Sequence, residues 1–127
     1  PLEILPMAAL SKNLEGKELN ELMDLYQYGA IGYTDADACI YHSGLMIRAL
    51  QYTQHTKAFV MQHPEETPLT AYGQMHEGEV STYLGLKGLP TLAEKLIILR
   101  DIELLKYSGG RIHFSRISTS ESLDVIR

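Results

Sequence analysis

Four short segments of the chain have the pattern of strands, and they alternate with segments of helical periodicity. The predicted strands cover residues 2–10, 30–33, 58–61 and 111–115. The third is the clearest, because a short apolar run between a lysine and a proline is typical of a strand buried on both faces of a parallel sheet.

Helices are expected between and after these strands. In the first, apolar residues recur at helical spacing and Gly29 follows as a C-terminal glycine. The helices are expected over residues 17–28, from Ser43 onward, over residues 78–83, from Thr91 to the Gly109-Gly110 pair, and over residues 122–127. Their N-terminal caps are expected at Ser43, at a capping box of Thr91 and Glu94, and at a second capping box of Ser118 and Glu121.

The order β-α-β-α-β-α-α-β-α predicts an α/β fold with a parallel sheet and right-handed crossovers. Residues 1–127 are long enough for one domain. Four βα units are about half of a TIM (β/α)₈ barrel. A small open doubly wound sheet is the alternative, and periodicity alone does not separate the two.

Composition excludes several classes of protein. The formal net charge of −5 gives no basic surface for nucleic acid. No apolar run reaches the roughly 18 residues of a membrane span. The one cysteine, Cys39, is expected to be a packing residue and fits a reducing compartment, so a cytoplasmic location is expected. Because the chain begins at Pro1, it is expected to be a segment of a longer protein.

His63 stands at the end of the third predicted strand and is followed by Pro64, Glu65 and Glu66. In α/β proteins the carboxyl ends of parallel strands carry the chemistry, which makes His63 a site candidate. A histidine that is only hydrogen-bonded at a strand end is the plainer alternative. Three other histidines are expected in turns or on helix faces, exposed to solvent: His42, His55 and His76.

Several stretches together resemble dihydroorotases, metal enzymes of the amidohydrolase superfamily. His63-Pro64-Glu65-Glu66 resembles the family's His-Cys-Glu-Asp. The other matching stretches are residues 6–19, Gly29-Ala30-Ile31-Gly32-Tyr33-Thr34-Asp35, residues 45–52, residues 77–90, Arg100-Asp101-Ile102-Glu103-Leu104, and residues 109–119. The resemblance implies the third to sixth strands of a TIM barrel, zinc as the metal, and aspartate carbamoyltransferase as a partner. The family's His-x-His pair and catalytic aspartate are not in this sequence.

The metal-ligand positions implied by this resemblance are largely replaced. Where the family has Asp-Asp-Gly, with the second aspartate bridging the metals, this chain has Asp35-Ala36-Asp37. Where the family's last histidine of His-x-x-His-Val-Ser-Thr binds metal, this chain has Arg116. Only His63 keeps a ligand side chain, and one imidazole does not hold a catalytic zinc, which needs about three protein ligands.

Arg116 is expected to take the place and part of the charge of the metal, and to pair with Asp35 or Glu65. His113 is not a substitute ligand, because it lies about 10 Å back along the strand and on the other face. Asp35 and Asp37 have a plainer interpretation as turn or capping residues.

Three functions remain open. The first is a dihydroorotase-like protein of pyrimidine biosynthesis that has lost its metal centre and serves as a structural or regulatory subunit. The second is an active dihydroorotase, which closes N-carbamoyl-L-aspartate to dihydroorotate. The third is a related cyclic amidohydrolase with another substrate. In each case the two edges of the sheet are expected to be covered by further barrel segments or by a second copy of the chain.

Overall fold

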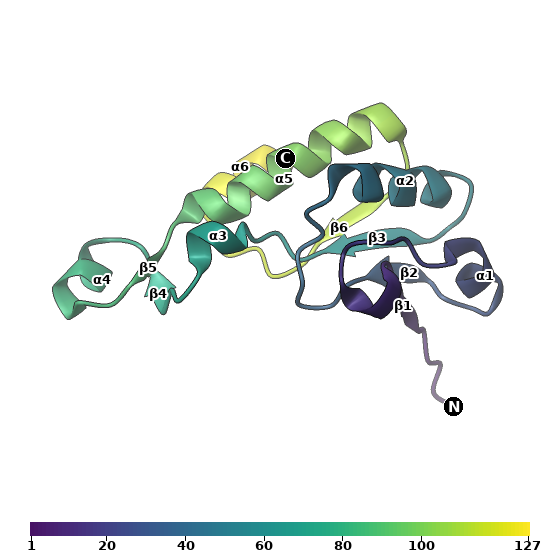
Figure 1. The fold of residues 1–127 in the computed structure, drawn as a ribbon, viewed down its shortest axis with the longest axis horizontal. Coiled ribbons are helices and arrows are strands. Elements are labelled where there is room, and N and C mark those ends of the chain that lie inside the picture. Colours follow the sequence, from purple (N-terminus) through teal and green to yellow (C-terminus); the bar gives the residue numbers. More distant parts are fainter.

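The computed structural model describes all residues from 1 to 127, and a four-stranded parallel sheet lies at its centre (Figure 1). The strands are β1 (Met7–Ala9), β2 (Gly32–Thr34), β3 (Phe59–Gln62) and β6 (Ile112–Phe114). They lie in the order β1-β2-β3-β6, and each neighbouring pair is parallel. The predicted parallel sheet in sequence order is therefore confirmed. A doubly wound sheet is excluded, because its strand order would reverse around its first strand.

Helices cover one face of this sheet. The helices of the whole chain are η1 (Lys12–Leu14), α1 (Leu22–Gln27), α2 (Ser43–Gln54), α3 (Thr67–Thr70), α4 (Glu79–Leu84), α5 (Thr91–Ser108) and α6 (Ser120–Ile126). In Figure 1, α2 and α5 run side by side over β3 and β6, and α6 packs against α5.

The core lies between the sheet and α2. The side chains of Tyr33 and Val60 point to this side of the sheet, and Leu45, Met46 and Leu50 meet them from α2. Successive residues of a strand face opposite sides, so a second set lies on the other face of the sheet. This face carries Met7, Ala9, Gly32, Thr34, Phe59, Met61 and His113. None of these seven residues belongs to the core.

Each outer strand of the sheet has a strand partner on one side only. β1 pairs with β2, and β6 pairs with β3. That further barrel segments or a second copy cover these edges stays a prediction.

Two predicted elements are longer than the observed ones. The strand predicted over residues 2–10 is reduced to Met7–Ala9, since Pro6 has no N–H to donate to a ladder, and Leu2 and Ile4 are exposed. The helix predicted over residues 17–28 begins only at Leu22. The stretch before it instead folds back on the end of β1, where Lys12 N–H donates to the Glu18 carbonyl and Asn20 N–H to the Leu10 carbonyl.

The predicted N-terminal caps of the helices were wrong. Two caps lie one residue away from the predicted position, and one predicted capping box does not form. His42, not Ser43, caps α2, since its Nδ1 accepts from Leu45 N–H. Thr119, not Ser118, caps α6 and accepts from Ser122 N–H. The Thr91 and Glu94 capping box does not form, because the Glu94 carboxylate is bound elsewhere. The predicted stops at Gly29 and Gly109 are confirmed.

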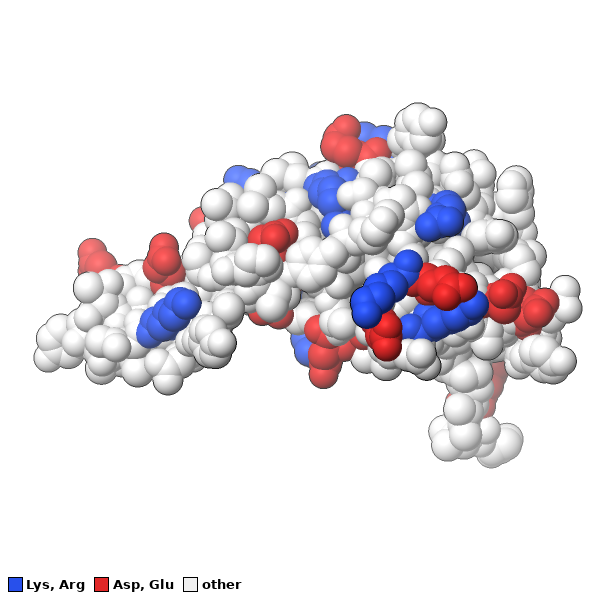
Figure 2. All heavy atoms as spheres, viewed as in Figure 1, with Lys and Arg blue, Asp and Glu red and all other residues white.

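A small lobe projects from the body at one end of the molecule (Figure 1). It holds the two-stranded parallel sheet of β4 (Met75–His76) and β5 (Gly88–Leu89), joined through α4. The sequence predicted α4 to within one residue but only a connection where β4 lies. Figure 2 shows that the visible face of this lobe carries few charges, whereas charges of both signs mix on the body. No helix of the chain is long and apolar enough to cross a membrane.

Replacing Gly110 by alanine is expected to destabilise the protein by about 2 kcal/mol, because the residue joins α5 to β6 with φ of 92° and no free space. A Cβ atom there would lie 2.4 Å from the Leu50 carbonyl oxygen. Gly29→Ala is the matched control, since Gly29 also has positive φ but nothing within 4 Å of its Cβ position. Denaturant unfolding of the two variants would compare them. Equal losses would mean that the close approach to α2 contributes nothing.

Candidate functional site

Every strand of the main sheet ends at the same edge, because all four are parallel. His63 follows β3 directly, and Asp35 follows β2. Arg116 lies two residues beyond the end of β6. The three positions singled out from the sequence therefore do gather at one edge of the fold.

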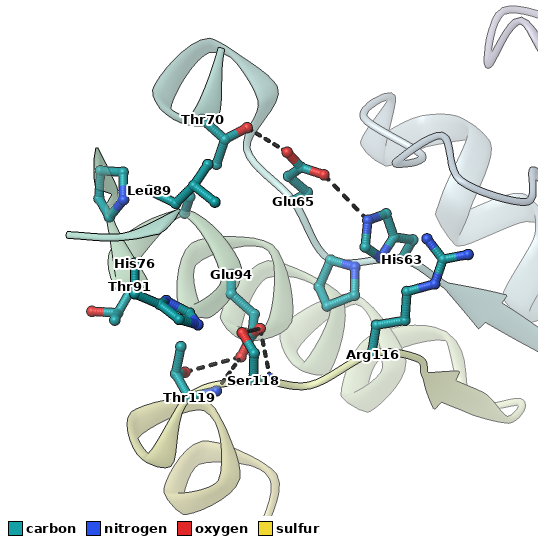
Figure 3. Close-up of a pocket in the computed structure, with 13 residues that line it drawn as sticks. His63, Glu65, Thr70, His76, Leu89, Thr91, Glu94, Arg116, Ser118 and Thr119 are labelled. Carbon is teal, nitrogen blue, oxygen red and sulfur yellow. Dashed lines mark hydrogen bonds and ion pairs between the residues drawn. The ribbon is translucent and has the colours of Figure 1, made fainter. Parts of the chain in front are cut away.

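His63 is held by a carboxylate from its own loop. Its Nε2 lies 3.2 Å from Glu65 Oε2, and Thr70 Oγ1 donates to the other oxygen of Glu65 at 2.5 Å (Figure 3). Since a carboxylate can only accept, Nε2 donates in this contact, and in the neutral ring Nδ1 then carries the lone pair. Nδ1 is buried and has no hydrogen-bond partner. This is the tautomer in which an imidazole can bind a metal ion or a donor group.

Asp35 is buried and serves the loop after β1. Its two oxygens accept from Ser11 N–H at 2.8 Å and from Ser11 Oγ at 2.5 Å, and Gly16 N–H in turn donates to Ser11 Oγ. Asp35 thus fixes a loop that is distant in sequence and does not cap its own turn, and both of its oxygens accept hydrogen bonds.

Arg116 pairs with Asp37, not with Asp35 or Glu65 as predicted. Its Nη2 forms an ion pair with Asp37 Oδ1, and both side chains are mostly exposed. The prediction failed because both carboxylates already accept other hydrogen bonds, Asp35 from Ser11 of the loop after β1 and Glu65 from His63 and Thr70 of its own loop. Since β2 ends at Thr34, Asp37 lies in the turn beyond the strand, where it can reach the loop after β6.

Ala36 and Arg116, the two positions where the resemblance implies metal ligands, both have left-handed backbone conformations. Their φ values are 57° and 58°. Among residues other than glycine, this region is uncommon, and aspartate and histidine are several-fold enriched there. These are the residue types that the resemblance to dihydroorotases implies at the two positions.

A cavity of about 210 Å³ opens beside His63 (Figure 3). Its wall comes from the loop after β3, the lobe, the start of α5 and the loop after β6. Its lining includes His63, Glu65, Thr70, His76, Glu94 and Arg116. His76 reaches the cavity from β4 and is exposed. His42 and His55 lie elsewhere and are also exposed, so the predicted exposure of the three histidines is confirmed.

Glu94 fixes the loop that carries Arg116. Its carboxylate accepts from the N–H and hydroxyl of Ser118 at 2.9 and 2.7 Å, and from the N–H and hydroxyl of Thr119 at 3.2 and 2.9 Å. Burial by itself raises the pKa of the Glu94 carboxyl, but hydrogen bonds from Ser122, Ser118 and Thr119 outweigh it and hold the pKa below its usual value. The first turn of α5 and the loop after β6 are thus joined through one ionised side chain.

Glu94→Gln is expected to cost about 2 kcal/mol of stability at neutral pH, because an amide cannot accept from all four donors. With its pKa lowered in the folded state, Glu94 gives its full contribution above about pH 4.3, the usual pKa of glutamate, and loses it as the pH falls through the folded value. The difference between the variant and the parent should therefore shrink in acid. Urea unfolding at several pH values measures this, with the exposed Glu121→Gln as control. A pH-independent difference would contradict the role given to the charge.

A second polar network, missed from the sequence, lies under the site. Asp101 of α5 is fully buried and accepts from Arg100 and from Gln62 Nε2, the latter at 3.0 Å. Arg100 also donates to the carbonyls of Ile40 and Tyr41 in the loop after β2. The network ties α5 to the residue before His63 and to the loop that carries Ala36. An Arg-Asp pair inside an apolar helix was the one signal in the sequence.

The residues of this chain do not by themselves fit a catalytic metal. No group of three or more His, Cys, Asp or Glu side chains is close enough to hold an ion. His113 lies on the open face of the sheet, with its ring 6.2 Å from that of Phe59. Cys39 is buried, as predicted for a packing residue, and burial raises the pKa of its thiol to about 11. His63 Nδ1 is the one buried side-chain nitrogen or oxygen without a hydrogen-bond partner.

Comparison with known proteins identifies the family. A family model described as "Dihydro-orotase-like" matches residues 1–122. Proteins named dihydroorotase from Pelotomaculum thermopropionicum and Syntrophus aciditrophicus are each 40% identical over 126 residues, which is 99% of this chain and 30% of theirs. The dihydroorotase of Caldicellulosiruptor saccharolyticus is 40% identical over 127 residues, again 30% of its length. The chain thus spans about a third of these relatives, and its parallel βα units are a segment of a TIM barrel. On these matches, the chain belongs to the dihydroorotase-like family.

Proposed function

We propose that the chain is part of a dihydroorotase-like protein of pyrimidine biosynthesis that has lost its metal centre and serves as a structural or regulatory subunit. The observation that carries the proposal is the state of the two replaced positions. Ala36 has no ligand atom, and Arg116 places a permanent cation in an ion pair with Asp37. A guanidinium near the metal position repels a divalent ion by several kcal/mol at intermediate dielectric.

Family membership supports the pathway but leaves activity open, because the chain is about a third of its relatives. One observation favours an active dihydroorotase instead, which is the free and buried Nδ1 of His63. That atom could join ligands supplied by parts of a longer protein. A related cyclic amidohydrolase with another substrate would need the same ligands.

Metal analysis of the purified full-length protein tests the proposal, together with an assay of dihydroorotate hydrolysis. The expected result is zinc well below one equivalent and no turnover that a chelator abolishes. Near-stoichiometric zinc with chelator-sensitive turnover of dihydroorotate would establish the active enzyme. The same result with a hydantoin in place of dihydroorotate would favour the related amidohydrolase.

The proposed subunit role implies a partner, and aspartate carbamoyltransferase in the cytoplasm is the one that the family suggests. Co-purification of that enzyme with the full-length protein is the expected outcome. A full-length protein that remains alone when the two are mixed at micromolar concentrations would count against the subunit role.

A further inference from the structure

The two loops that have lost their ligands still keep the backbone that suits those ligands. Ala36 and Arg116 are left-handed, although neither alanine nor arginine favours this region. Such conformations persist only where the surrounding structure fixes them. A metal ion bound at both positions would join the loop after β2 to the loop after β6, so its loss removes one restraint on each.

Each loop is anchored separately to its own side of the sheet. Asp35 binds the first loop to Ser11, and Glu94 binds the second to α5. These anchors do not link the two loops to each other. The ion pair of Asp37 and Arg116 does, across 79 positions in sequence.

Both partners of this ion pair are departures from the dihydroorotase pattern. Asp37 stands where the family's Asp-Asp-Gly has glycine, and Arg116 stands where the family has a metal-binding histidine. The two new side chains contact each other between the two loops that a metal would have joined. Random decay of a metal site gives no reason for a new acid and a new base to meet there.

We propose that the Asp37–Arg116 ion pair replaces the metal ion as the link between the ends of β2 and β6. The inference rests on the proposed loss of the metal. The side chains are 77% and 61% exposed, so the link is worth at most about fivefold in the unfolding equilibrium constant and is weakened by salt. The ion pair is expected to restrain the two loops more than it stabilises the whole fold.

A double-mutant cycle in the full-length protein tests this link. Asp37→Asn, Arg116→Gln and the double variant are unfolded with denaturant in the presence of a chelator, at low and at high salt. The expected coupling is about two- to fivefold in the unfolding constant at low salt, and it is lost at about 1 M salt. Each single variant should also speed amide hydrogen exchange at Ala36 and at Ser118, one in each loop, whose N–H groups donate to Thr34 Oγ1 and to Glu94.

The matched control is the exposed ion pair of Glu103 and Lys106, which lies within α5. Breaking it should leave exchange at Ala36 and Ser118 unchanged. Additive effects of the Asp37 and Arg116 substitutions, with unchanged exchange in both loops, would overturn the link whatever the metal content. Stoichiometric zinc with the coupling intact would overturn the proposed function instead, and the ion pair would then not be a replacement.

Discussion

Replacing Ala36 by aspartate and Arg116 by histidine together is expected to raise the zinc affinity of the full-length protein by more than about 100-fold. Two ligand side chains would join His63, and a permanent positive charge would leave the site. Even partners outside the ligand set are worth about 10- to 100-fold in metal affinity. Both substitutions also suit the backbone, because aspartate and histidine are enriched at the positive φ values found here. Competition with a chromogenic chelator measures the affinity.

Arg111→His is the control for this experiment. It makes the same exchange of side chains just before β6, where Arg111 donates to the Lys57 carbonyl away from the site. The control should leave zinc affinity unchanged, and each single substitution should give less than the pair. A double variant that binds zinc no better than its parent would show that positions 36 and 116 are not where a metal is held.

Asp101→Ala is expected to be the most damaging single substitution, with a loss of about 3 kcal/mol or more. Asp101 is fully buried, and its removal strips partners from Arg100 and Gln62 at once. Burial raises the pKa of the Asp101 carboxyl, but the Arg100 guanidinium and hydrogen bonds oppose this shift. Denaturant unfolding of the full-length protein measures the loss.

Glu103→Ala on the same helix is the matched control, because Glu103 is exposed and pairs only with Lys106. It should cost no more than about 0.5 kcal/mol. If Asp101→Ala cost no more than this control, the hydrogen bonds from Arg100 to the carbonyls of Ile40 and Tyr41 would be enough to stabilise its buried charge.

The order and direction of the strands were predictable because short apolar segments alternate regularly with helical ones. β3 is apolar from Phe59 to Met61, and polar residues return at Gln62 and His63. The regular alternation of units then fixes the handedness and the neighbours. Because parallel strands all end at one edge of the sheet, His63, Asp35 and Arg116 could be assigned to that edge from the sequence.

The partners of the polar residues were not predictable, because they depend on which groups have already been satisfied. Glu94 has the spacing of a capping box with Thr91, yet four donors in the loop after β6 outcompete that local bond. Arg116 had three nearby acidic candidates. Two of them were occupied by other hydrogen bonds, Asp35 with Ser11 and Glu65 with Thr70, and sequence spacing does not reveal such competition.

The two ends of the chain segment that forms the projecting lobe lie side by side. Gln74 N–H donates to the Lys87 carbonyl at 2.9 Å, so the chain leaves and returns at nearly the same point. The segment between them supplies no residue to the main sheet or to its core. Evolution can therefore lengthen, shorten or exchange residues 75–86 without disturbing the rest of the fold. A change of length within this segment should therefore leave the main sheet and its core intact, and side chains such as Tyr83 are exposed there.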